Sequence, residues 1–260
     1  FAIYLTSTTP TDGYFGAIGT FDVYGFPKLR NGELSAASVW VQNSQKAVFN
    51  STNSIQAGWD VNPDLYGDSK THFFVYWTAD SSNSTGCSNL DCIGFVPVNG
   101  APITPGDALE PADGKTKITS KIFKKEDDGD WWLYFGYNVN NLRPVGFWPK
   151  TIFTDMADQA TSIAWGGLTH SNKGKPSPPM GNGQWPGQYS ASVQNIQYVN
   201  KKGQGLSPSG WRDSLVALAP FITCYRASSV VDDMFHYGGQ GGCTIFLMST
   251  TFGKFEITGL

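Results

Sequence analysis

The sequence predicts an all-β protein, an antiparallel β-sandwich of the jelly-roll or lectin-like type with one short helix. Segments in which apolar and polar residues alternate recur along the chain, and Gly, Pro, Asn or Asp separates them. This pattern is typical of sandwiches and barrels. The chain has 30 glycines and 15 prolines among 260 residues, and this composition favours many turns over long helices.

The expected strands are short, and turn-forming residues bound each of them. In chain order they are Ala37–Val41, Ile55–Val61, Thr71–Thr78, Lys117–Lys124, Trp131–Tyr137, Ser162–His170, Ala191–Tyr198, Gly242–Met248 and Phe252–Ile257.

One stretch, Trp148–Ala160, predicts the single helix. Pro149 suits a first helical turn, and Ile152, Phe153 and Met156 recur on one side, as in an amphipathic helix that packs on a sheet.

Two polar loops, Asp107–Gly114 and His170–Gly187, lie between these elements, and the second is long enough to carry a function. No internal repeat and no break in composition divides the chain. We therefore expect one domain over residues 1–260.

Charge and hydropathy exclude several classes of partner. With 18 basic and 21 acidic residues the net charge is −3, which argues against a nucleic-acid partner. No run of 18 apolar residues is present, so we expect no membrane-spanning helix. There is no phosphate-binding loop and no dinucleotide fingerprint. We expect a monomer without a cofactor.

The cysteines predict an oxidising compartment. Cys87 lies near Cys92, and Cys224 lies near Cys243. We expect two local disulfides, Cys87–Cys92 and Cys224–Cys243, in a secreted protein. A zinc site is the weaker alternative, because the two pairs lie far apart and no His stands at ligand spacing.

Two N-glycosylation sequences, which begin at Asn50 and Asn83, support secretion. The chain begins Phe-Ala-Ile-Tyr-Leu, without Met or a basic segment, and this resembles a processed start.

Titratable residues with catalytic spacing are absent from the sequence. The chain has three His, and it contains no Gly-x-Ser-x-Gly elbow and no His-Glu-x-x-His motif. The acidic cluster at 126–130 indicates a solvated hairpin turn, since it lacks the later ligand of a calcium loop. We expect structural roles for His72 and His236.

Several aromatic and glycine-rich segments carry a family resemblance. They are Ile-Gln-Ala-Gly-Trp-Asp-Val-Asn-Pro at 55–63, Tyr-Gly-Asp at 66–68, Tyr-Trp-Thr at 76–78, Thr-Gly-Cys at 85–87, Asp-Trp-Trp-Leu at 130–133, Val-Gly-Phe-Trp-Pro at 145–149, Ala-Trp-Gly-Gly at 164–167 and Pro-Met-Gly-Asn-Gly at 179–183. In order and content they resemble the C-terminal domain of the neprosin family of plant proteins.

The resemblance extends over nearly the whole chain, and it implies a fold and an activity. The family's domain is a secreted antiparallel β-sandwich whose N-terminal pro-segment is removed. The peptidase is a glutamic endopeptidase that cuts after proline at acidic pH without a metal. We expect residues 1–260 to be this domain, with the pro-segment absent, in the apoplast or another secretory compartment.

Two departures from the family pattern concern catalysis. The resemblance places one catalytic glutamate at Gln56 and the other at Leu168. An amide cannot exchange protons as a carboxyl group does, and Leu168 has no polar side-chain atom. Strand alternation and the nearby glycines suggest a cleft around these positions. Its expected residues are Gly58, Trp59, Trp165, Gly166 and His170.

Three hypotheses follow from these departures. The first is a secreted, non-catalytic relative of the glutamic prolyl endopeptidases that binds an extended polymer in an aromatic cleft. The polymer is a proline-rich peptide or a cell-wall polysaccharide, because aromatic rings stack on proline and on sugars alike. The second is an active acid endopeptidase, with Glu in fact present at position 56 or with another catalytic group. The third is a structural or storage protein.

Overall fold

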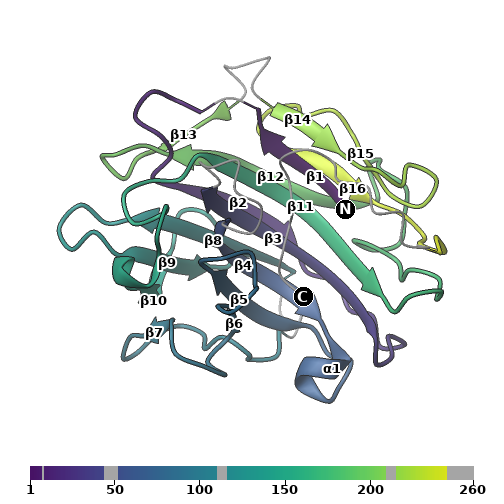
Figure 1. Cartoon of the computed structure of the whole chain (residues 1–260). Helices are drawn as coiled ribbons and strands as arrows, with labels where there is room; N and C mark the ends of the chain where they lie inside the picture. The colour runs from purple at the N-terminus through teal and green to yellow at the C-terminus, as the bar shows by residue number, and fades with distance from the viewer. Residues whose placement is uncertain (8, 44–51, 110–115, 209–214, 245–260) are drawn as a thin grey trace.

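Two antiparallel β-sheets pack face to face in the computed structural model, which describes residues 1–7, 9–43, 52–109, 116–208 and 215–244 (Figure 1). This architecture confirms the predicted β-sandwich. Asn50, the end of the loop at 107–114, residues 245–248 and the expected strand at 252–257 lie outside the described residues.

In the part of the chain that the structure describes, the first sheet has seven strands, in the order β14-β1-β11-β3-β4-β5-β6. Its central strands, β3 and β4, are among the longest in the molecule, and β11 and β5 pair with their outer edges. The strands are β1 (Ala2–Thr6), β3 (Glu33–Asn43), β4 (Asn53–Val61), β5 (His72–Thr78), β6 (Cys87–Ser88), β11 (Ser162–Ser171) and β14 (Leu215–Leu218).

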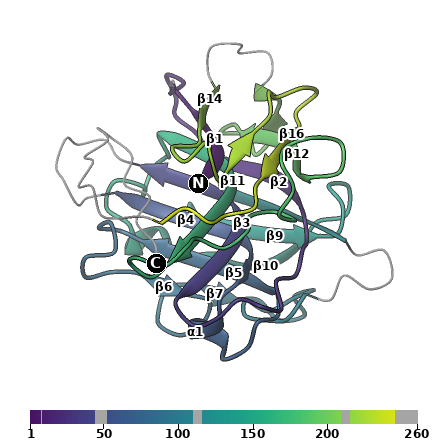
Figure 2. The same ribbon diagram turned by 90° about the vertical axis from the view of Figure 1, so that its right-hand side faces the viewer.

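The second sheet has nine strands among the described residues, eight of them in the order β15-β16-β12-β2-β8-β9-β10-β7, with β13 paired to β12 (Figure 1). Figure 2 shows its strands β16, β12, β2, β9, β10 and β7 after a turn of 90°. They are β2 (Gly16–Asp22), β7 (Val96–Pro97), β8 (Lys117–Lys124), β9 (Trp131–Gly136), β10 (Arg143–Trp148), β12 (Ala191–Val199), β13 (Gly205–Leu206), β15 (Arg226–Ala227) and β16 (Phe235–Gly238).

The main core fills the space between the sheets. Alternate residues of β3 and β4, such as Val39 and Trp59, contribute to it from the first sheet, and Phe21 and Leu133 contribute from the second. A second, smaller cluster contains Leu34 and Ala36, which alternate along β3 with the residues of the main core. The first sheet therefore has buried apolar side chains on both of its faces.

Seven of the expected strands are confirmed, as β3, β4, β5, β8, β9, β11 and β12. The strand expected from Gly242 is wrong at its beginning, where Thr244 makes only an isolated bridge to Pro176. The sequence pattern did not predict the other nine strands of the described residues, which are β1, β2, β6, β7, β10, β13, β14, β15 and β16.

The short helix is present, but the expected position is wrong. Among the described residues the one α-helix is α1 (Pro63–Tyr66), which follows β4. Asn62 caps its N-terminus by accepting a hydrogen bond from the Leu65 amide, Pro63 fits its first turn, and Gly67 ends it in the left-handed conformation.

Residues 148–160 form the end of β10, a short 3-10 turn η1 (Lys150–Ile152) and further turns instead of a helix. Side chains of other strands form hydrogen bonds with the backbone groups that an α-helix would use for its own hydrogen bonds. Asn53 Oδ1 accepts from the Thr154 and Met156 amides, and Trp131 Nε1 donates to the Met156 carbonyl. Because these partners are already in place, the stretch gains little from intrahelical bonds.

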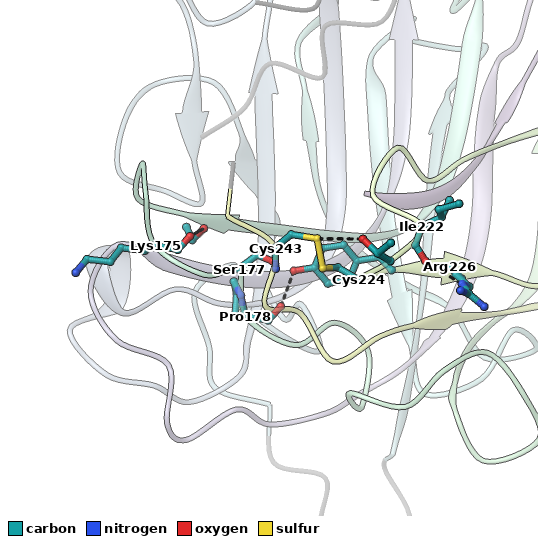
Figure 3. Close-up of a disulfide and its surroundings, with 10 residues drawn as sticks. Lys175, Ser177, Pro178, Ile222, Cys224, Arg226 and Cys243 are labelled. Atoms are coloured by element: carbon teal, nitrogen blue, oxygen red, sulfur yellow. Dashed lines mark hydrogen bonds between the residues drawn. A yellow bond between two sulfur atoms is a disulfide. The ribbon is translucent and has the colours of Figure 1, made fainter. Parts of the chain in front are cut away.

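Both expected disulfides are confirmed. Cys87 and Cys92 have Cα atoms 5.8 Å apart, and Cys224 and Cys243 have Cα atoms 6.0 Å apart. Figure 3 shows the second bridge beside Ser177 and Pro178 of the long loop at 170–187, where the Cys243 amide donates to Ser177 Oγ. The bridge therefore joins the end of the described chain to Cys224, and hydrogen bonds between Ser177 and Cys243 attach it to the loop.

No helix in the described part of the chain is long and apolar enough to cross a membrane.

Candidate functional site

A cavity of about 130 Å³ lies on the face of the first sheet that is turned away from the second. The strands β3, β4, β5 and β11 supply most of its lining, and the segment around α1 closes one end. Its lining residues are Leu34, Ala36, Gln56, Asp60, Asn62, Leu65, Phe74, Tyr76, Ser88 and Leu168.

The strand register brings Gln56 and Leu168 to this one cavity. Both β4 and β11 pair with β3, where Gln56 lies opposite Trp40 and Leu168 lies opposite Ala36. Trp40 and Ala36 are four residues apart, so they share one face of β3. Two positions that are 112 residues apart in the sequence thus line the same small space.

Gln56 offers an unused hydrogen-bond donor to this space. Gln56 is only 2% exposed, and its side-chain Nε2 atom has no hydrogen-bond partner. A buried amide without a partner costs free energy, so it is a favourable place for a ligand acceptor.

Leu168 makes its side of the cavity apolar. It is 6% exposed and packs in the smaller apolar cluster with Leu34, Ala36 and Phe74. A carboxyl group at this position would have apolar neighbours, and none of the cavity-lining residues is a Lys, Arg or His.

Asp60 is the cavity residue that the sequence argument missed. It lies four residues after Gln56 on the same face of β4 and is 3% exposed. In register it is opposite Ala36 on one side and His72 on the other. The available signal was a lone acidic residue inside an otherwise uncharged strand, on the alternating face that also holds Gln56.

A hydrogen-bonded chain holds the Asp60 carboxyl group. Tyr66 Oη of α1 donates to Asp60 Oδ1 at 2.8 Å, and Asn89 Nδ2 donates to Tyr66 Oη at 3.1 Å. The Tyr66 ring stacks on His72, with ring centroids 3.8 Å apart. The helix α1 thus positions the Tyr66 hydroxyl group so that it donates to the Asp60 carboxyl group.

Burial raises the pKa of Asp60 to about 7, although the Tyr66 hydrogen bond and the nearby His72 both favour the charged form. Burial also raises the pKa of Tyr66, which therefore remains a donor. The cavity holds a carboxyl group that changes its charge near neutral pH.

The structure corrects the prediction that Trp59 and Trp165 belong to the cleft. Both indoles are fully buried in the core between the sheets, where they donate to the carbonyls of Asp22 and Ile18. Side chains an odd number of positions apart point to opposite faces of a strand. Trp59 is three positions from Gln56, and Trp165 is three positions from Leu168, so neither indole lies on the face of the cavity. The aromatic residues of the cavity are instead Phe74 and Tyr76.

The glycines and the histidine of the predicted cleft do not line the cavity either. A Cβ atom on Gly58 would lie 2.0 Å from the Ala37 carbonyl oxygen, and one on Gly166 would lie 2.4 Å from the Ala2 carbonyl oxygen. These glycines therefore permit close approach of neighbouring strands, and they do not open space for a ligand. His170 is exposed near the end of β11.

His72 has the structural role that we expected. Its Nδ1 atom lies 2.7 Å from the Gly106 carbonyl oxygen, and its Nε2 atom lies 3.0 Å from Asp68 Oδ1. Both ring nitrogens are thus occupied. Within the described ranges no group of three or more His, Cys, Asp or Glu residues is arranged to hold a metal ion.

A larger hollow of about 390 Å³ lies between residues 25–29 and the loop at 176–179. Four prolines and Phe26 form much of its surface, and its acidic residue, Glu33, already accepts a hydrogen bond from the Arg30 amide. We regard the smaller cavity as the candidate site, because it has a buried donor without a partner and a buried carboxyl group.

The molecule is thus a two-sheet antiparallel β-sandwich with a small cavity on one sheet, lined by apolar and polar residues in equal number. A profile of the Neprosin family matches residues 31–240. The chain belongs to the neprosin family, which includes glutamic peptidases, because this match covers well over half of its length and both cavity positions, Gln56 and Leu168.

Solved structures with a similar chain trace include scytalido-glutamic peptidase with a peptide-based transition-state analogue, at 11% identity, 92% coverage of this chain, 96% of that chain and a TM-score of 0.45. SCP-B, a member of the Eqolisin family of peptidases, in complex with the tripeptide Ala-Ile-His, has 10% identity, coverage of 92% and 96%, and a TM-score of 0.44.

Proposed function

We propose that the protein is a secreted, non-catalytic member of the neprosin family that binds an extended peptide at the cavity on its first sheet. One observation carries the proposal. The two positions that the resemblance assigns to the catalytic glutamates line this cavity together, and they hold an amide and a leucine side chain.

Loss of the family mechanism follows from these two side chains. A glutamic peptidase needs one carboxylate to deprotonate water and a second group to protonate or stabilise the tetrahedral species. Gln56 can donate a hydrogen bond but has no acid-base range, and Leu168 can do neither. General acid-base catalysis contributes about 10² to 10⁴ in rate, so cleavage should fall to background.

The groups that remain are suited to binding a peptide. Gln56 Nε2 can donate to a peptide carbonyl, and the cavity has room for one small apolar side chain. Phe74 and Tyr76 add aromatic surface of the kind that packs on proline rings. A polysaccharide is the alternative ligand, because five of the ten lining residues carry side chains that can form hydrogen bonds, namely Gln56, Asp60, Asn62, Tyr76 and Ser88.

Two features support secretion as part of the proposal. Structural disulfides persist in oxidising compartments, and this chain has two. Asn83 lies in an exposed turn, where a glycan can be attached.

A residual peptidase is the second candidate, and Asp60 is the observation that favours it. Asp60 supplies a carboxyl group to the cavity. It is, however, the single carboxyl group among the residues that line the described cavity, whereas the family mechanism uses a pair. We therefore rank this candidate below peptide binding.

The test combines cleavage and binding. A blocked proline-containing octapeptide is incubated with the protein at pH 3 to 5, mass spectrometry follows its cleavage, and calorimetry measures its binding. We expect binding, with no cleavage above a heat-denatured control. Gln56→Ala should weaken binding by about tenfold through loss of one hydrogen bond. The exposed Gln188→Ala is the matched control.

Cleavage after proline by the unaltered protein would overturn the non-catalytic proposal. Binding on a glycan array with no binding of peptides would replace the peptide by a polysaccharide. Absence of both ligands would favour a structural or storage role.

A further inference from the structure

The Asp60 carboxyl group stands at a fixed spacing from the free donor of Gln56. The two residues are four positions apart on β4, with the side chain of neither turned toward the main core. At about 3.3 Å per residue this separation is about 13 Å along the strand. Residues i and i+4 of an extended peptide have the same spacing, and their carbonyl groups point to the same side.

The carboxyl group is held in one position by residues that do not belong to β4. Tyr66 donates to it, and Asn89 donates to Tyr66 while Asn89 Oδ1 accepts from the Val75 amide at 3.1 Å. The stacking of Tyr66 on His72 restricts the phenol further. A ligand therefore meets Asp60 in a preorganised position, which reduces the entropy lost on binding.

We propose that Asp60 is a proton-dependent anchor for the bound peptide: in its neutral form it donates a hydrogen bond to one peptide carbonyl, while Gln56 Nε2 donates to a second carbonyl about four residues away. This inference rests on the proposed function. It adds a residue and a pH dependence that the two glutamate positions do not supply.

The charges around Asp60 set the pH range. Among the described residues, the titratable groups that interact with it are Tyr66 of α1 and His72 of β5, and His72 is itself paired with Asp68. The facing residues of β3 and β11, Ala36 and Leu168, carry no charge. Burial outweighs the two favourable contacts and raises the pKa of Asp60 to about 7.

Ligand binding should therefore weaken as the pH rises. Asp60 is already almost fully buried, so its ionised form gains no cation from a bound peptide and repels the carbonyl oxygen that it faces. The neutral acid has no such cost and can donate to a carbonyl. If binding requires one proton on Asp60, the Kd rises by up to about tenfold for each pH unit above about 7.

The experiment measures the Kd of the blocked, uncharged proline-containing octapeptide from pH 5 to 9 by calorimetry. In Asp60→Asn, the amide keeps the shape and a donor but does not titrate, so its Kd should stay flat above pH 7. Asp127→Asn, an exposed acidic residue of the turn after β8, should behave as the unaltered protein does. Tyr66→Phe removes a hydrogen bond to the carboxylate and should move the transition to higher pH.

The outcomes separate this inference from the proposed function. Because Asp60→Asn keeps His72 and Asp68, any pH dependence that those residues cause persists in the variant. The same pH dependence in Asp60→Asn, or a flat Kd in the unaltered protein, overturns the anchor and leaves peptide binding intact. No binding at any pH overturns both proposals. Should Asp60→Asn fold poorly by circular dichroism, an unshifted transition in Tyr66→Phe overturns the anchor.

Discussion

The proposed loss of catalysis depends on two residues, Gln56 and Leu168. The resemblance and the alternation of β4 and β11 were sufficient to select them, because both arguments concern the strand itself. Those arguments could not select Asp60, since its burial and its contact with Tyr66 depend on how α1 folds back over the sheet. Trp59 and Trp165 were misplaced although the alternation rule alone puts them on the core face.

Leu168→Glu should destabilise the protein in a pH-dependent way. The new carboxyl group would replace an apolar side chain among Leu34, Ala36 and Phe74. We expect the free energy of unfolding at pH 7 to fall by about 3 kcal/mol, with a smaller loss at pH 4, where the group is neutral. Leu168→Met should cost less than about 1.5 kcal/mol. Urea denaturation measures both, and an unchanged stability of Leu168→Glu at pH 7 would show that this position is not apolar.

Asp60→Asn should stabilise the protein at alkaline pH. The pKa of Asp60 is raised from 3.8 to about 7 in the folded state, so the folded protein binds the proton more tightly than the unfolded chain does. Stability therefore falls as the pH rises from about 4 to about 7. At about 1.4 kcal/mol per pKa unit, the penalty above pH 7 reaches about 4 kcal/mol.

Thermal unfolding at pH 4 and pH 8 measures this effect. The advantage of Asp60→Asn should appear at pH 8 and vanish at pH 4, and Asp127→Asn should show no such difference. A loss of stability in Asp60→Asn at pH 8 would mean that the carboxylate is well paired in the folded protein.

At the scale of elements, strands with strong alternation were predictable, and elements that depend on distant partners were not. The strand β2 has two glycines among seven residues and forms between β8 and β12, which supply its hydrogen bonds. The stretch after β10 has a helical pattern of apolar residues, and Phe153 and Met156 are indeed buried. Its backbone, however, is bound by Asn53 and Trp131 from other strands.

Asn53→Ala tests this explanation of the stretch after β10. The Asn53 side chain accepts from the Thr154 and Met156 amides and donates to the Ala79 carbonyl. Its removal leaves several buried groups without partners, and we expect a loss of about 3 kcal/mol in the free energy of unfolding. The exposed Asn141→Ala should change it by less than about 0.5 kcal/mol. Equal urea midpoints for the two variants would contradict this account.

At the scale of the whole molecule, two disulfides and a core between two sheets hold the cavity-bearing sheet in place. The bridge Cys224–Cys243 spans 19 residues, and Cys87–Cys92 spans 5. On the loop-entropy model, removing the first should cost about 3 kcal/mol and removing the second about 2 kcal/mol. Urea denaturation of the two double Cys→Ala variants tests this order, and a larger loss at Cys87–Cys92 would contradict it.

The two sheets also show how substitutions at the cavity can be accommodated without a change of fold. The indoles of Trp59 and Trp165 link the first sheet to β2 from the core face, whereas Gln56 and Leu168 lie on the other face. Substitution at the cavity therefore leaves the contacts between the sheets unchanged.

One measurement tests the central claim most directly, namely that the cavity binds a peptide without cutting it. The ¹⁵N-labelled protein is titrated at pH 5 with the blocked proline-containing octapeptide, and one set of NMR spectra follows both molecules overnight. We predict shifts at Gln56, Asp60 and Tyr76, with the peptide signals intact. Replacement of the peptide signals by those of two fragments, one with a C-terminal proline, would contradict the account, and so would a saturating titration that shifts none of these residues.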